Sequence, residues 1–108
     1  MASMQGKAGL VTAAGAGIGR ASALALAGAG AKVLVSDISE DGVAETVSLI
    51  REAGGTAESM VGDAAAEETA VAMVERVVEL WGALDFAHNN AGIGAPNRPF
   101  EEQDGAEW

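Results

Sequence analysis

The stretch Thr-Ala-Ala-Gly-Ala-Gly-Ile-Gly, residues 12–19, decides the fold that this sequence predicts. It follows a short apolar run at residues 9–13 and opens an alanine-rich run at residues 17–29. A continuous apolar run bounded by glycine is typical of a parallel strand covered on both faces. Alanine is the best helix former, and Gly28 and Gly30 mark the end of the helix. The stretch therefore predicts a strand, a glycine turn and a helix in succession.

The next stretch of the chain repeats this alternation. Residues 32–36, Lys-Val-Leu-Val-Ser, predict a second strand that stops at Asp37. Apolar residues then recur at helical spacing and stop at two glycines, which predicts a second amphipathic helix: Val43, Val47 and Ile50, followed by Gly54 and Gly55. Residues 56–61 follow this helix and end at a glycine, so they predict a third strand.

The last third of the chain predicts one more helix and one more strand. Glu67 and Glu68 stand where acidic side chains suit the first turn of a helix. An apolar stripe at helical spacing follows them, formed by Val71, Val74, Val78 and Trp81. Residues 84–88 predict a fourth strand, residues 89–99 a loop, and the acidic segment from Phe100 the start of a further helix.

Strands that alternate with helices through short links predict an α/β fold, an open parallel sheet with helices on both faces. We expect one domain over residues 1–108. Ligands of such sheets bind at the carboxyl ends of the strands. The conspicuous residues of this sequence fall at those ends: Gly17, Asp37, Asp63 and Asn90.

Composition excludes several classes of protein. The chain has 108 residues, no cysteine and a net charge of −10, so a disulfide-stapled secreted module is excluded and nucleic acid is a poor partner. No run reaches the roughly 18 consecutive apolar residues of a membrane span. The apolar stretch after Lys7 is broken by glycines, which makes it a poor signal peptide. We therefore expect a soluble, cytoplasmic protein.

The glycine turn and Asp37 together predict a dinucleotide site. Glycines between a strand and a helix let the backbone approach a diphosphate, and the amides at the helix start stabilise its charge. Asp37 lies 18 positions beyond Gly19, close to the roughly 20 typical of the acidic residue that binds the ribose. Its carboxylate would repel a 2′-phosphate, so NAD is expected over NADP. The alternatives are a turn that binds nothing and a helix cap at Asp37.

The other conspicuous residues do not predict a further binding or catalytic site. Gly19 is followed by Arg20 and Ala21, which excludes a triphosphate-binding loop. Arg20 lies inside the helix, one turn past the glycine motif, so we expect it to have a surface or packing role and not to bind phosphate. We expect His88, the single histidine, not to act in catalysis. The acidic residues near the carboxyl terminus predict a solvated helix face, not a metal site.

These residues resemble the cofactor half of the short-chain dehydrogenase/reductase family. The resemblance rests on residues 12–19, on Asp37, on Asp63, and on Asn-Asn-Ala-Gly at residues 89–92. The first motif of the family is TGxxxGxG, in which Ala13 replaces the first glycine. The resemblance implies a Rossmann-like sheet of about four strands, in the order 3-2-1-4.

The resemblance also implies which residues bind the cofactor. The pyrophosphate and ribose would contact the glycine turn, namely Ala13, Gly15, Ala16, Gly17, Ile18 and Gly19. The adenosine ribose would contact Asp37 and Ile38 at the end of the second strand, and the adenine would contact Asp63 and Ala64 at the end of the third. The nicotinamide side would contact the residues after the fourth strand, namely Asn90, Ala91 and Gly92.

The catalytic half of the family is absent from this sequence. The family uses a tyrosine, a lysine four residues later and a serine, whereas this chain has no tyrosine and its two lysines are Lys7 and Lys32. We therefore expect no catalytic residue here and no activity of the chain alone. The parent enzyme would be a homo-oligomer that transfers hydride between NAD and an alcohol or carbonyl substrate. The alternatives are a stand-alone nucleotide-binding or structural half-domain and, more remotely, a methyltransferase-like nucleotide fold.

Overall fold

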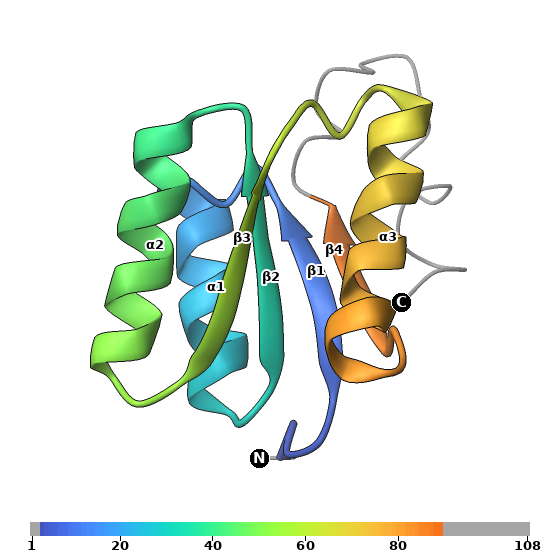
Figure 1. Ribbon diagram of the computed structural model, residues 1–108. Coiled ribbons are helices and arrows are strands. Elements are labelled where there is room, and N and C mark those ends of the chain that lie inside the picture. Colours follow the sequence, from blue (N-terminus) through green and yellow to red (C-terminus); the bar gives the residue numbers. More distant parts are fainter. Residues whose placement is uncertain (1–2, 90–108) are drawn as a thin grey trace.

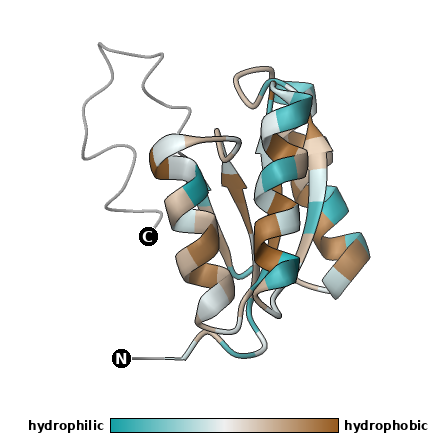
Figure 2. Ribbon diagram, turned by 90° about the vertical axis from the view of Figure 1, so that its left-hand side faces the viewer, coloured by the Kyte–Doolittle hydropathy of each residue, from teal (hydrophilic) through white to brown (hydrophobic). Residues whose placement is uncertain are grey.

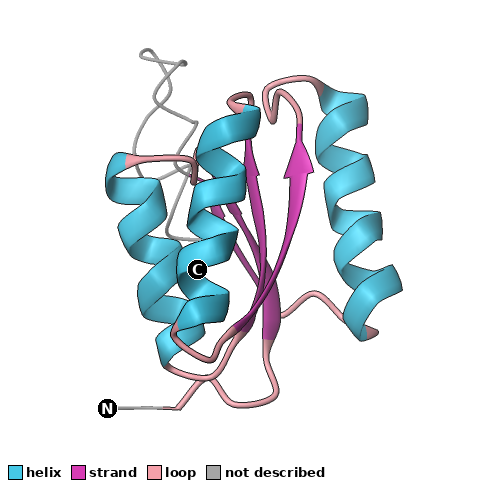
Figure 3. Ribbon diagram, turned by 60° about the vertical axis from the view of Figure 1, so that its left-hand side comes forward, coloured by secondary structure: helices cyan, strands magenta, loops and turns pink. Residues whose placement is uncertain are grey.

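The computed structural model describes residues 3–89, which form a parallel sheet with helices on both faces (Figures 1 and 3). The strands are β1 (Ala8–Thr12), β2 (Lys32–Asp37), β3 (Thr56–Val61) and β4 (Phe86–Asn89). The helices are α1 (Gly17–Gly28), α2 (Glu40–Glu52) and α3 (Glu67–Trp81). The four strands lie in the order β3-β2-β1-β4, and every neighbouring pair is parallel. The predicted fold class and strand order are confirmed.

The fourth strand begins two residues later than the sequence predicts. Asp85 holds the start of β1, because its N–H donates to the Ala8 carbonyl (2.7 Å) and its Oδ2 accepts from the Ala8 N–H (2.9 Å). Strand pairing then begins with Phe86 opposite Gly9 and ends with Asn89 opposite Thr12. Asn89 thus belongs to the strand and not to the predicted loop. The rest of that loop and the predicted last helix lie outside the described residues.

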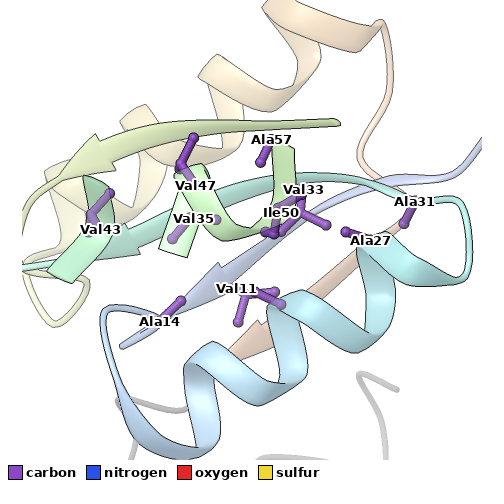
Figure 4. Packing of buried hydrophobic residues seen from close by; sticks show 11 residues of the cluster. Val11, Ala14, Ala27, Ala31, Val33, Val35, Val43, Val47, Ile50 and Ala57 are labelled. Atoms are coloured by element: carbon purple, nitrogen blue, oxygen red, sulfur yellow. The ribbon is translucent and has the colours of Figure 1, made fainter. Parts of the chain in front are cut away.

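One core lies between the sheet and the pair α1 and α2 (Figure 4). Side chains alternate along β2, so that Val33 and Val35 enter this core while Leu34 faces the opposite side of the sheet. Small alanines of α1 let the helix approach the strands closely. The core comprises Val11, Ala14, Ala23, Ala27, Ala31, Val33, Val35, Val43, Val47, Ile50 and Ala57.

The second core lies under α3, and it corrects the face that the sequence predicts for this helix. The helix itself is confirmed, but Met73 and Val77 are its buried residues, packed with Ala8, Leu10 and Leu34. Trp81 packs partly against this cluster, as expected. The rest of the predicted stripe is exposed: Val71 by 50%, Val74 by 36% and Val78 by 44%. α3 carries two apolar stripes, and the sheet takes the one that begins at Met73.

The helices show the banding of amphipathic segments, with hydrophilic and hydrophobic residues alternating along each ribbon (Figure 2). None of the helices between residues 3 and 89 is long and apolar enough to cross a bilayer. Within the same residues, no group of three or more acidic or histidine side chains could hold a metal ion.

Gly9 makes room for the pairing of β1 with β4, which yields a first prediction. A Cβ at Gly9 would collide with the ring of Phe86, whereas a Cβ at Gly28 would meet no atom within 4 Å. We expect Gly9→Ala to lower the free energy of unfolding by about 1–3 kcal/mol through overpacking. Gly28→Ala should raise it by up to about 1 kcal/mol because alanine favours the helix. Urea unfolding followed by circular dichroism measures both, and equal stability of the two variants would contradict the packing described.

The face of α3 gives a second prediction, from two neighbouring valines. Val77→Ala should lower the free energy of unfolding by about 1.5–3 kcal/mol, because it opens a cavity in the second core. Val78→Ala removes the same atoms from a half-exposed position and should change stability by less than about 0.5 kcal/mol. Both substitutions gain the same helix propensity, so the difference between them reports burial alone. A larger loss at Val78 would restore the stripe predicted from the sequence.

Candidate functional site

The carboxyl ends of β1, β2 and β3 lie together at one end of the molecule, where the arrows of Figure 1 point. The chain leaving β1 stays beside β2, since the Ala14 N–H donates to the Ser36 carbonyl (2.9 Å). The chain leaving β3 also stays beside β2, since the Gly62 N–H donates to the Asp37 carbonyl (2.9 Å). The glycine turn, Asp37 and the segment after Gly62 therefore share one edge of the sheet, as predicted.

The turn between β1 and α1 has a backbone that favours glycine at two positions. Gly17 has φ +59°, and a Cβ there would meet no atom within 4 Å, so its outer side is open. Ala13 has φ +53° and is the one non-glycine residue in the left-handed region between residues 3 and 89. The first glycine of the family motif falls at this position, and alanine adopts the same conformation at a cost of about 1–2 kcal/mol. Gly19 packs directly on the Ala13 backbone.

The start of α1 differs from the start of α2. Ser39 caps α2 by accepting from the Gly42 N–H (3.1 Å), and Glu40 and Asp41 lie in its first turn. The first turn of α1 contains no acidic residue, and its N-cap residue, Ala16, offers no side-chain hydrogen bond. The first amides of a helix carry a partial positive charge and need acceptors. α1 thus presents exposed, uncapped amides at the glycine turn.

Asp37 lies directly against the glycine turn. Its Oδ2 accepts from the Gly15 N–H at 2.8 Å, and a Cβ at Gly15 would stand only 2.8 Å from the same oxygen. Its Oδ1 accepts from the N–H groups of Ile38 (2.6 Å) and Ser39 (3.3 Å). Ser39, not Asp37, is the N-cap of α2, so capping does not account for this aspartate. A glycine turn and a carboxylate 22 residues apart in sequence are hydrogen-bonded neighbours.

The opposite side of the turn is held by α2. Arg20 donates from Nη2 to the Gly15 carbonyl (2.6 Å) and from Nε to Thr46 Oγ1 (2.8 Å). The Thr46 hydroxyl donates to the Ala14 carbonyl (2.7 Å). A Cβ at Gly42 would stand 2.7 Å from the Gly15 oxygen, so only glycine fits there. The expected packing role of Arg20 is confirmed.

Thr46 and Gly42 are contacts that the sequence analysis missed. A hydroxyl on the apolar face of a helix, between Val43 and Val47, signals a tertiary hydrogen bond. A glycine inside the first turn of a helix that is otherwise rich in good helix formers signals a close approach of backbone. Both signals were present in the sequence, although neither identifies the partner.

The end of β3 completes the edge. Asp63 is exposed and closes a tight turn, with its Oδ1 accepting from the Ala65 N–H (2.9 Å) and its carbonyl from the Ala66 N–H (3.0 Å). Ala66 and not Asp63 is the N-cap of α3. Ala64 packs partly against the second core. Two large apolar side chains stand out into solvent at this edge, Ile18 (78% exposed) and Ile38 (72% exposed).

The remaining predicted site residues follow β4, which ends at Asn89. Asn90, Ala91 and Gly92 lie outside the described residues. His88, on β4, has its Nε2 3.5 Å from Ser22 Oγ of α1. A groove elsewhere, between α2 and β3, contains none of the predicted residues; it is lined by Ala44, Val47, Ser48, Arg51, Glu52 and Ser59.

The sequence is similar to known oxidoreductases, some of which are dehydrogenases. The sequence model described as short chain dehydrogenase matches residues 7–108. An uncharacterized oxidoreductase of Thermotoga maritima is 47% identical over 91 residues, which are 84% of this chain and 36% of that protein. The 7alpha-hydroxysteroid dehydrogenase of Escherichia coli K12 is 39% identical over 98 residues, which are 91% of this chain and 38% of that enzyme.

A solved structure shows the same fold. The 7 alpha-hydroxysteroid dehydrogenase complexed with NADH and 7-oxo glycochenodeoxycholic acid superposes with a TM-score of 0.76 at 35% identity, covering 79% of this chain and 33% of that one. This chain therefore spans little more than a third of the relatives that it matches. The family match extends over nearly the whole sequence, and the fold and the glycine turn agree with it. The chain belongs to the short-chain dehydrogenase family.

Proposed function

We propose that the edge formed by the glycine turn, Asp37 and the end of β3 binds the adenosine diphosphate part of NAD. The observation that carries this proposal is the 2.8 Å hydrogen bond between the Gly15 N–H and Asp37 Oδ2. It sets the backbone amides that suit a diphosphate beside the carboxylate that suits a ribose diol. Asn90, Ala91 and Gly92 complete the proposed site on the nicotinamide side, from the family resemblance.

The glycine turn fits a diphosphate by charge and by space. Gly17 leaves its outer side open, and α1 begins there without an acidic residue or a side-chain cap. Amides of an uncapped helix start donate to anions, and the helix dipole favours negative charge at this end. Ala13, Gly15, Ala16, Ile18 and Gly19 form the rest of this wall of the proposed site.

Asp37 fits the ribose of NAD better than that of NADP. A carboxylate accepts about four hydrogen bonds, and Asp37 receives three from backbone amides, so Oδ2 retains room for a hydroxyl. A 2′-phosphate would bring a second negative charge to the same place. The exposed side chain of Ile38 offers an apolar surface to the adenine, beside Asp63 and Ala64. These features support NAD as the cofactor.

The activity of a longer enzyme follows from the family. We propose that this chain, residues 1–108, represents the cofactor-binding part of a cytoplasmic oxidoreductase that forms homo-oligomers and acts on an alcohol or carbonyl substrate. NAD supplies the acceptor or donor of hydride when it is bound. A titratable group must move the accompanying proton, and the tyrosine and the following lysine that the family uses for this have no counterpart in the sequence. The chain alone should therefore bind cofactor without turnover.

Asp37→Asn tests the cofactor assignment, because it keeps the acceptor for Gly15 and removes the charge. We expect the chain to bind NADH at least about tenfold more tightly than NADPH, which is about 1.4 kcal/mol, and Asp37→Asn to reduce this ratio to near one. Asp41→Asn, an exposed residue of the first turn of α2, is the matched control and should leave the ratio unchanged. Isothermal titration or fluorescence of NADH measures the affinities.

Two results would contradict the proposal. Equal affinity of the unmodified chain for NADH and NADPH would remove the role of Asp37. Turnover of an alcohol with NAD by this chain alone would show that the proton is moved by a group other than the one the family uses.

A further inference from the structure

Arg20 makes a set of contacts that dinucleotide binding alone does not require. Its side chain is 23% exposed and reaches from α1 to α2, where Nη2 lies 3.1 Å from Glu45 Oε1 and 3.4 Å from the Gly42 carbonyl. The same Nη2 lies 2.6 Å from the Gly15 carbonyl. Nε and Nη2 of the guanidinium are thus engaged with hydroxyl, carbonyl and carboxylate oxygens on the side of the glycine turn that faces α2.

Thr46 extends this contact to the preceding peptide group. Its hydroxyl oxygen accepts from Arg20 Nε at 2.8 Å and its proton goes to the Ala14 carbonyl at 2.7 Å. Thr46 is fully buried. Arg20 and Thr46 therefore hold two successive carbonyls of the turn, those of Ala14 and Gly15, on the side that faces α2.

Because peptide groups are planar, the hydrogen bonds to the Ala14 and Gly15 carbonyls also fix the direction of the N–H groups that follow them. In a trans peptide the carbonyl and the following N–H point in opposite directions. With its carbonyl on Thr46, the Ala14–Gly15 peptide directs its N–H away from α2, and this N–H reaches Asp37. With its carbonyl on Arg20, the Gly15–Ala16 peptide directs the Ala16 N–H away from α2 as well. That N–H belongs to Ala16, the exposed N-cap residue of α1, whose side chain makes no capping hydrogen bond.

We propose that Arg20, acting through Thr46 and the Gly15 carbonyl, is a positioning residue that aims the Ala16 N–H at the diphosphate. The inference rests on the proposed function, since it assumes that a diphosphate occupies the open side of the turn. Arg20 itself touches no ligand in this scheme. It holds the flexible glycine-rich backbone in the orientation that binds the ligand, so that less conformational entropy is lost on binding.

This role requires arginine, because one side chain must donate to two acceptors at a fixed spacing, Thr46 Oγ1 and the Gly15 carbonyl. The planar guanidinium presents Nε to Thr46 and Nη2 to Gly15 at the same time, whereas a lysine ammonium is a point charge on a flexible stem. Arg20→Lys therefore keeps the positive charge near the site but cannot donate to Thr46 and to the Gly15 carbonyl at the same fixed spacing. A decrease of affinity in this variant separates positioning from a mere electrostatic contribution of the charge.

The test compares two ligands that differ in the diphosphate. ADP carries it and adenosine does not, and both contain the ribose that Asp37 would bind. We expect Arg20→Lys and Thr46→Val to raise the Kd for ADP about fivefold to tenfold, the order of one hydrogen bond, with the Kd for adenosine changed by less than about twofold. Thr46→Ser keeps the hydroxyl and should restore the affinity for ADP. Amide NMR titration of the full chain measures both constants.

A neighbouring core position provides the control for stability. Val47→Ala removes buried atoms from α2 one residue after Thr46 and leaves every hydrogen bond of the turn in place. It should lower the unfolding midpoint and leave the ratio of the two Kd values as in the unmodified chain. Urea unfolding of every variant shows that the comparison is made on folded protein, and Arg20→Lys carries the test if Thr46→Val does not fold.

The outcomes separate this inference from the proposed function. A ratio unchanged in both Arg20→Lys and Thr46→Val, or changed equally in Val47→Ala, would overturn the positioning role while ADP binding by the unmodified chain still supports the site. An unmodified chain that binds neither ADP nor NADH would overturn the proposed function and this inference with it.

Discussion

The hydrogen bond from the Gly15 N–H to the Asp37 carboxylate is the interaction on which the site depends. It exists because β1 and β2 are parallel neighbours whose ends lie level, so that the turn leaving β1 passes the last residue of β2. Parallel strands require crossover helices, and α1 accordingly begins at the turn itself. The closeness of the glycine turn, the start of α1 and the Asp37 carboxylate thus follows from the pairing of β1 with β2.

The same arrangement explains why α2 matters to the turn. The glycine turn has few side chains of its own to fix its backbone, and its carbonyls are held by residues of other elements: Arg20 on α1 and Thr46 on α2. Gly42 lets the first turn of α2 come close enough for this. A turn that must leave one side open for a ligand is therefore stabilised from the other side.

Much of this could be predicted from local sequence. The turn and the place of Asp37 at the end of a strand follow from spacing and glycine content within about 25 residues, whereas the strand order is implied by the family resemblance. The face of α3 could not be predicted, because the helix has two apolar stripes and only the positions of Leu10 and Leu34 decide which one is buried. The hydrogen bond of Thr46 could not be predicted for the same reason, because its partner, the Ala14 carbonyl, lies 32 residues away and no local pattern identifies it.

The central claim is that the glycine turn and Asp37 form one ligand surface. The most direct test is the amide spectrum of the isotope-labelled chain as NADH is added to saturation. The account predicts that the largest shifts arise at residues 15–19 and at Ile38, together in one binding event. Shifts confined to the groove between α2 and β3, at Ser48, Arg51 and Ser59, would contradict it.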